Sequence, residues 1–153
     1  MSNQITVARD RLLALWRVAA VATAASVVEA TWVSTDSAVG HVFKTRMPGT
    51  RNRGRMPLVE IDFSSDDNTY LNDEGGMAAI AFDVHIYTSG IQNKTREELA
   101  EAIMSAGERS MRGHAENYFE NMTSQTSLVD DRPEWFLMTR TFTIELPWSA
   151  DSV

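Results

Sequence analysis

The stretch MAAIAFDVHIYTS, residues 77–89, decides the fold class, because its side chains alternate between apolar and polar along its length. The bulky apolar side chains share one face: Ile80, Phe82, Val84 and Ile86. The other face carries Ala81, Asp83, His85 and Tyr87. A period of two residues predicts a β-strand that turns one face toward a hydrophobic core.

Alternation of the same kind predicts strands on both sides of this stretch. LVEIDF, residues 58–63, carries two acids on the face opposite its apolar side chains, and a short extended stretch at residues 38–46 precedes it. FLMTRTFTIELPW, residues 136–148, predicts a last strand, which Pro147 should end because proline lacks the N–H that a strand ladder needs. Its inward side chains are predicted to be Met138, Phe142, Ile144 and Leu146, and its outward ones Thr139, Thr141, Thr143 and Glu145.

Apolar residues at helical spacing over residues 4–30 predict a long amphipathic helix. The apolar run within it is similar to the core of a secretory signal peptide, which is removed from a mature protein. Arg17 interrupts that run and Asp10 lies among the preceding cations, so we favour a helix over a signal peptide. Arg17 also disfavours a membrane span, which needs about 20 apolar residues. The residues at helical spacing are Ile5, Leu12, Trp16, Ala19, Thr23 and Val27.

A second helix is expected to begin after Thr95 and to run to about Phe119. Thr95 followed by Glu98 forms a capping box, in which the threonine hydroxyl accepts a hydrogen bond from the N–H three residues later. Its apolar stripe is predicted to contain Leu99, Ile103, Ala106 and Met111.

Together these elements predict one α+β domain over residues 1–153, in the order α-β-β-β-α-β. We expect a mixed four-stranded sheet with the two main helices packed on one face. The first two strands should form a long antiparallel β-hairpin, whose tip is the segment between them. The third strand, the second helix and the last strand should form a right-handed β-α-β crossover.

Composition and motifs argue against several kinds of catalytic and metal site. The chain has no cysteine, so a disulfide, a thiolate zinc site and a cysteine nucleophile are excluded. It also lacks a phosphate-binding loop, a dinucleotide fingerprint and a nucleophile elbow. The acidic stretches at residues 62–67 and 72–76 lack the spacing of a calcium-binding loop, so a solvated loop explains them better than a cation site. We assign no catalytic, cofactor-binding or metal-binding residue and expect no enzyme.

One strand face offers an alternative to that expectation. Asp83, His85 and Tyr87 share the polar face of the strand predicted at residues 77–89, where an acid, a base and a hydroxyl could act together. The alternation of a half-exposed sheet accounts for the same residues without any chemistry. A small enzyme with this face as its site is therefore the least favoured interpretation.

Charge is strongly segregated along the chain. The net charge is −7, yet five cations and no acid fall between residues 44 and 55, so the remainder carries −12. The basic segment contains Lys44, Arg46, Arg51, Arg53 and Arg55. The acidic segment that follows contains Glu60, Asp62, Asp66, Asp67, Asp73 and Glu74. Oppositely charged segments can pair head to tail between copies of one chain, and a contact of this kind closes into a ring.

The arginines also allow a second interpretation, a small nucleic-acid-binding module. Arginine binds phosphate with two parallel hydrogen bonds, so the basic segment could grip a nucleic-acid backbone. Domains with that function usually carry a basic face over much of their surface and aromatic side chains on which bases stack. This chain is acidic overall, and no aromatic residue lies among the arginines. We therefore favour a protein partner and keep nucleic acid as the alternative.

Five stretches together resemble a known family: ALWRVAAVATAASVV (14–28), PLVEIDF (57–63), AAIAFDVHIYT (78–88), NKTREELAEAI (93–103) and RTFTIELPW (140–148). In this order, and in a chain of this length, they resemble the tail terminator (tail completion) proteins of long-tailed bacteriophages. The resemblance covers nearly the whole chain and lies in its architecture rather than in a short motif.

That resemblance implies a structural virion protein that forms a homohexameric ring on the finished tail tube, stops tube polymerisation and joins the tail to the head. Its implied partners are copies of itself, the tail tube protein and a head-completion or neck protein. DNA is expected to pass through the lumen without sequence-specific binding, and neither a cofactor nor a membrane is implied. The implied location is the tail–neck junction of the virion, after assembly in the host cytoplasm.

Overall fold

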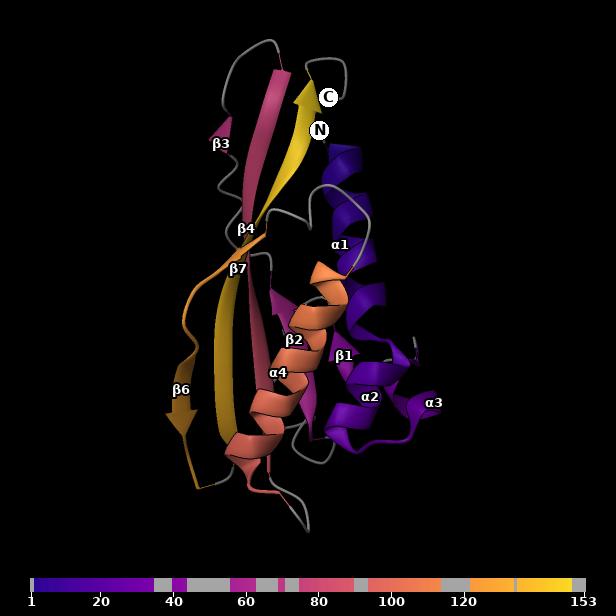
Figure 1. Ribbon diagram of the computed structural model, residues 1–153, viewed down its shortest axis with the longest axis vertical. Coiled ribbons are helices and arrows are strands. Elements are labelled where there is room, and N and C mark those ends of the chain that lie inside the picture. The colour runs from indigo at the N-terminus through magenta and orange to yellow at the C-terminus, as the bar shows by residue number, and fades with distance from the viewer. Residues whose placement is uncertain are drawn as a thin grey trace.

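A long antiparallel pair of strands, β4 (Gly75–Thr88) and β7 (Phe136–Ser149), forms the centre of the fold. The computed structural model describes residues 2–34, 40–43, 56–62, 69–70, 75–89, 94–113, 122–133 and 135–149. The two strands run side by side along the long axis of the molecule, with Gly75 opposite Ser149 and Thr88 opposite Phe136 (Figure 1). The two strands with the clearest alternation are therefore confirmed.

Shorter strands extend the sheet on both sides of this pair. β2 (Leu58–Asp62) pairs antiparallel with β4, and β1 (Val42–Phe43) pairs with β2. β5 (Thr123–Ser124) and β6 (Leu128–Asp131) both pair antiparallel with β7. β3 (Thr69–Tyr70) pairs with the first part of β4. The described strands form a largely antiparallel sheet, and with the helices beside it they confirm the α+β class.

The antiparallel hairpin predicted for the first two strands is wrong, because β1 and β2 pair in parallel. Contacts with the N-terminal helices hold β1 in place. Arg17 donates from Nη2 to the carbonyl of Val42 over 2.7 Å, and burial lowers the pKa of its guanidinium. The ring of His41 stacks on Trp32 with 5.6 Å between centroids. Arg17 and Trp32 are separated in the sequence from the residues that they contact near β1. The alternation of side chains within β1 and β2 therefore could not show that these two strands run parallel.

The predicted β-α-β crossover is wrong as well, because β4 and β7 are antiparallel. The chain enters β7 from β6, and the N–H of Arg132 donates to the carbonyl of Trp135 over 2.9 Å where the two strands are joined. Pro147 does not end β7 either, because its backbone pairs opposite Met77 and the strand continues to Ser149. A proline is tolerated in a strand where its missing N–H points away from the neighbour.

The helix predicted over residues 4–30 is broken into three pieces: α1 (Ser2–Trp16), α2 (Ala19–Ala25) and α3 (Glu29–Trp32). Val18 interrupts it with an extended backbone, at φ −79° and ψ 158°. The break turns a new face of the chain toward the core. As a result, Ala19 and Thr23, which the helical spacing grouped with the buried residues, are exposed.

Tertiary hydrogen bonds satisfy the carbonyl groups that this break leaves without helical partners. The hydroxyl of Ser110 donates to the carbonyl of Leu15 over 2.6 Å. The Nε1 of Trp32 donates to the carbonyl of Trp16 over 2.9 Å. The kink is therefore stabilised by donors from α3 and from the next long helix, and not by local sequence alone.

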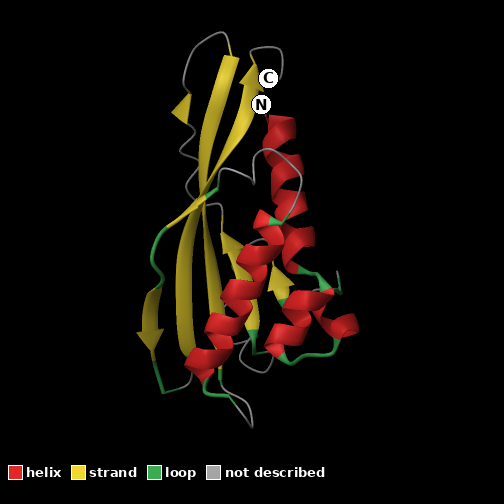
Figure 2. Cartoon of the chain, in the orientation of Figure 1, coloured by secondary structure: helices red, strands yellow, loops and turns green. Residues whose placement is uncertain are grey.

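The second predicted helix is confirmed as α4 (Arg96–Arg112). Thr95 Oγ1 accepts a hydrogen bond from the N–H of Glu98 over 3.1 Å, as the capping box predicts. Residues 114–121, into which the predicted helix extended, lie outside the described residues. In Figures 1 and 2 α4 lies along β4 and β7, and it contacts α1 and α2 as well.

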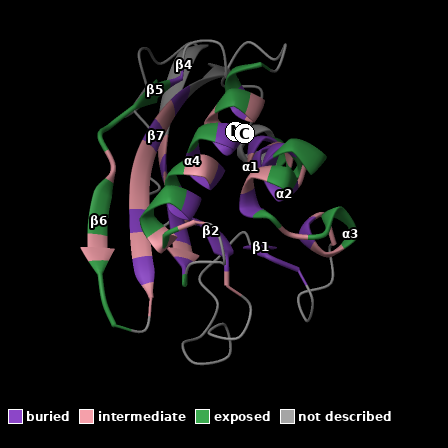
Figure 3. Ribbon diagram, turned by 60° about the horizontal axis from the view of Figure 1, so that its bottom comes forward, coloured by how far each residue is buried: buried purple, intermediate pink, exposed green. Residues whose placement is uncertain are grey.

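A hydrophobic core fills the space between these helices and the sheet. The helices turn buried sides inward, whereas β6 is mostly exposed (Figure 3). The following side chains, predicted to face inward, are buried: Val59, Ile61, Phe82, Val84, Ile86, Leu99, Ile103, Ala106, Met111, Met138, Phe142 and Ile144. The side chains of Phe63, Ile80 and Leu146 lie outside the described residues.

Candidate functional site

Most of the residues predicted to contact a partner lie outside the described part of the chain. This holds for the whole basic segment, Lys44, Arg46, Arg51, Arg53 and Arg55, and for Asp66, Asp67, Asp73 and Glu74 of the acidic segment. Their role in partner binding stays a prediction.

The two described members of the acidic segment, Glu60 and Asp62, lie on β2, where each is paired with a residue of β4. Glu60 is opposite His85 and only 2% exposed, so it offers almost no surface to a partner. Asp62 is partly buried, and its Oδ2 lies 3.8 Å from Nε2 of His85. Both acids are therefore engaged with the sheet of their own chain.

The polar face of β4 does not assemble into a catalytic constellation. Nδ1 of His85 is hydrogen-bonded to Oγ1 of Thr139 at 2.8 Å. Asp83 accepts a hydrogen bond from the hydroxyl of Thr141. Tyr87 packs edge-on against Trp135, at 5.5 Å between centroids. Alternate residues of a strand are about 7 Å apart, and each of the three β4 side chains has an interaction partner outside β4.

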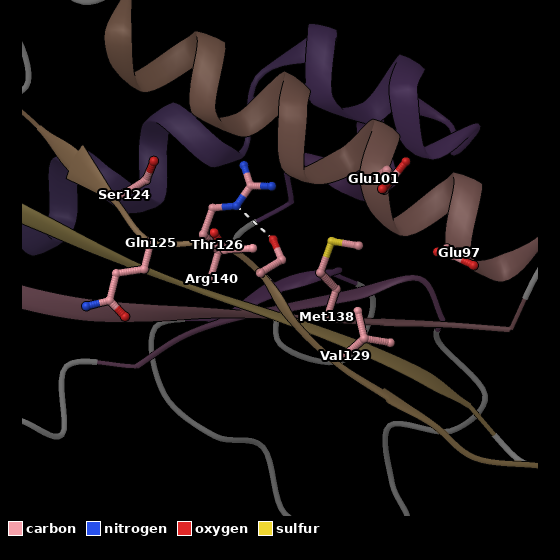
Figure 4. Close-up of a pocket in the computed structure, with 9 residues that line it drawn as sticks. Glu97, Glu101, Ser124, Gln125, Thr126, Val129, Met138 and Arg140 are labelled. Carbon is pink, nitrogen blue, oxygen red and sulfur yellow. Dashed lines mark hydrogen bonds between the residues drawn. The ribbon is translucent and has the colours of Figure 1, made fainter.

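An open groove of about 470 Å³ lies on the other side of the sheet, between α4 and the segment that joins β5 to β6. In Figure 4 its two glutamates come from α4, whereas the other labelled side chains come from the strands and the β5–β6 segment. The residues that line the groove are Glu97, Glu101, Ser124, Gln125, Thr126, Ser127, Val129, Met138 and Arg140.

The acidic wall of the groove is formed by two glutamates in the first turns of α4. Glu97 and Glu101 are four residues apart, which places them one above the other on the same helix face. Both side chains are exposed. Within the described part of the chain neither forms an ion pair, whereas the neighbouring Arg96 binds Asp131. The wall therefore presents two solvated carboxylates.

The opposite wall is the short segment 125–127, where the chain leaves the regular ladder between β5 and β6. The N–H of Gln125 donates to the carbonyl of Thr141 over 3.0 Å and keeps the segment attached to β7. Ser124 at the end of β5 and Gln125 and Thr126 of this segment are exposed residues that carry hydroxyl or amide groups. These groups can both donate and accept hydrogen bonds.

The floor of the groove combines apolar side chains with one arginine. Val129 and Met138 are cross-strand neighbours, and Val129 is 53% exposed. Arg140 donates from Nε to the hydroxyl of Ser127 over 2.8 Å, and its Nη1 lies 3.2 Å from Oε2 of Glu108. The charge of Arg140 is thus compensated inside the protein, and the groove as a whole is acidic.

Glu108 also holds the end of α4. Its Oε1 lies 3.3 Å from Nη2 of Arg112, and Nη1 of the same arginine donates to the carbonyl of Met122 over 2.9 Å. Arg112, Glu108 and Arg140 therefore connect the helix, the start of the β5–β6 region and β7.

The residue patterns of the sequence did not predict this groove. One residue of the sequence could have pointed to it. Arg140 lies between Met138 and Phe142, at a position of the last strand that the alternation predicts to face inward. A charged residue in the apolar phase of a strand needs a partner, because an unpaired buried charge is costly. Glu108 could not be identified as that partner from the sequence, because the two residues are 32 positions apart.

Comparisons with protein-family models and with curated proteins find no match for this chain. In the described ranges, no three histidine or carboxylate side chains come together as a metal site. Among the helices that the structure describes, none combines the length and the apolar character needed to cross a membrane.

Proposed function

We propose that this chain is a structural subunit of a bacteriophage tail that forms a ring, caps the tail tube, stops its polymerisation and joins the tail to the head or neck. One observation carries the self-assembly part of the proposal. β6 lies beside β7 at the edge of the sheet. Two consecutive apolar residues of this strand are exposed to solvent, Leu128 at 74% and Val129 at 53%. Among the described strands, β6 pairs with β7 alone.

An exposed edge strand offers unpaired backbone donors and acceptors to another chain, and soluble proteins usually protect such edges. Apolar side chains on that edge add surface that gains free energy when it is buried by a partner. The edge at β6 is distinct from the basic segment, so contacts that use both would join unlike surfaces of successive copies. Contacts of that type close into a ring when the rotation between successive copies adds up to a full turn.

The tail-capping part of the proposal comes from the resemblance in sequence architecture. In this proposal β1, β2, β4 and β7 are the four strands expected from the sequence, with the main helices α1 and α4 on one face. The ring has six copies, meets the tail tube protein on one side and a neck protein on the other, and belongs to the virion. No chemical reaction is part of this function.

Assembly of the purified chain tests the proposal directly. We expect a discrete closed ring, six copies in mass measurements and in electron micrographs, formed by the chain alone or on tail tubes. Added to polymerising tubes, the chain should stop their growth at a capped end. A strictly monomeric chain at high concentration that also leaves tube length unchanged would contradict the proposal. The nucleic-acid alternative stays a prediction, and no described residue favours it.

A further inference from the structure

We infer that the groove between α4 and the β5–β6 segment binds the basic segment, residues 44–55, of a neighbouring copy of this chain. The inference deepens the proposed function and rests on it, because it names the contact that joins successive copies of the ring. It differs from the pairing of basic and acidic segments expected from the sequence, of whose acids only Glu60, which is buried, and Asp62, which is partly buried, lie among the described residues.

The charges of the groove and of the basic segment are complementary. Glu97 and Glu101 are exposed at the groove, while the charge of Arg140 is compensated by Glu108. The basic segment carries five cations and no acid, in a chain whose remainder has a charge of −12. Opposite charges fix the partner and the register of a contact more than they raise its affinity.

The spacing of the two glutamates matches that of alternate residues in an extended peptide. Residues four apart on a helix have side chains about 6 Å apart, so Glu97 and Glu101 form a pair of carboxylates at that distance. Alternate residues of an extended peptide point to the same side about 7 Å apart. The arginines at 51, 53 and 55 alternate in this way, so a peptide bound in extended form can place two of them opposite the two glutamates.

The other residues that line the groove can contact both the guanidinium group and the methylene groups of an arginine. Exposed oxygens of Ser124, Gln125 and Thr126 can accept hydrogen bonds from a guanidinium group. The methylene groups of an arginine can pack on Val129 and Met138, as long cationic side chains do on apolar surface. A volume of about 470 Å³ is within the range of about 300–1,000 Å³ typical of ligand pockets.

A peptide probe tests the groove without requiring assembly. The probe is a fluorescent peptide of residues 43–57, FKTRMPGTRNRGRMP, titrated into full-length chain that carries R51Q/R53Q/R55Q, so that its own segment does not compete. We expect binding that weakens with salt and that falls roughly tenfold with E97Q/E101Q. The matched control compares Glu97→Gln with Glu98→Gln: each removes one negative charge from the first turn of α4, and because Glu98 is not among the lining residues, only Glu97→Gln should weaken binding. Absence of binding, or an equal loss with the control, would overturn the inference.

A mixing experiment then tests whether the contact joins two copies. E97R/E101R combines a basic groove with the unchanged basic segment. R51E/R53E/R55E combines the unchanged acidic groove with residues 44–55 whose net charge is now negative. Neither variant should therefore assemble alone. In a one-to-one mixture every groove meets an opposite segment, and assembly should return. Assembly of one chain carrying all five changes, but not of the mixture, would place the contact within a chain and overturn the inference.

The two proposals fail in different ways. If the unmodified chain forms rings but the peptide does not bind, the groove inference is overturned and the ring remains. If the peptide binds but the unmodified chain is always monomeric and caps no tube, the proposed function is contradicted, and the contact between copies is overturned with it.

Discussion

The indole ring of Trp16 occupies the space in which a Cβ atom of Gly107 would stand. A Cβ built on Gly107 would lie 2.3 Å from Cζ3 and Cη2 of that ring, far inside van der Waals contact. Nε1 of Trp16 is also 3.3 Å from Sδ of Met111, as a hydrogen-bond donor. The end of α1 therefore packs against the backbone of α4, the helix that carries the acidic wall of the groove.

Gly107→Ala should destabilise the fold by about 1–3 kcal/mol, because the added methyl group overlaps the buried ring. Helix propensity alone predicts the opposite sign, a gain of about 1 kcal/mol for alanine over glycine. Denaturant unfolding monitored by tryptophan fluorescence measures the difference. In a Trp16→Leu background most of the cost should disappear, and a stabilising Gly107→Ala in the unmodified chain would refute the close contact.

Ser110→Ala should cost about 1 kcal/mol of unfolding free energy, because the carbonyl of Leu15 loses its donor at the end of α1. Ser105→Ala is the matched control, since Ser105 is exposed on the same helix and gains the same alanine propensity. Chemical denaturation of both variants separates the lost hydrogen bond from that propensity. Equal effects at the two positions would show that the hydroxyl of Ser110 does not stabilise the kink.

Arg140→Gln should destabilise the chain by about 1–3 kcal/mol, because Glu108 and Ser127 both lose a charged partner in a partly buried site. Arg132→Gln removes an arginine from the more exposed pair with Asp130 and should cost at most about 1 kcal/mol. Thermal unfolding of the two variants in low and high salt gives the comparison. A cost no larger for Arg140 than for Arg132 would contradict the assigned role of the Glu108–Arg140 pair.

Leu128→Lys should block ring formation while leaving the isolated chain folded, because a charge on an edge strand opposes pairing with another chain. The concentration needed for half-assembly should rise at least about tenfold, as sedimentation can measure. Val28→Lys serves as control, because Val28 is similarly exposed at 72% but lies between α2 and α3. Unchanged assembly of Leu128→Lys would remove the β6 edge from the proposed function.

Duplex DNA should not bind the chain at physiological salt, because the protein's net charge of −7 repels the negatively charged DNA. If all five cations of the basic segment neutralised phosphates, the logarithm of the binding constant would fall with the logarithm of salt with a slope of about −4.5. Fluorescence titrations over a range of salt concentrations measure that slope. Binding with a slope of this size would favour the nucleic-acid alternative over a protein partner.

The sequence by itself determined the central strands, their buried faces and the start of α4. These features depend on interactions between residues a few positions apart. Alternating side chains must separate into core and surface on any strand, and the hydroxyl of Thr95 reaches the N–H of Glu98 in any helix that begins there.

Tertiary structure alone decided the direction of β1, the break at Val18, the course of β7 past Pro147 and the groove beside α4. Each depends on partners that are remote in sequence, such as Arg17 with Val42 or Glu108 with Arg140. A residue pattern records which face of an element is apolar, but not which element packs on it or in which direction. That choice is made by the packing and the hydrogen bonds of the whole chain, which is why only the folded protein reveals the acidic groove.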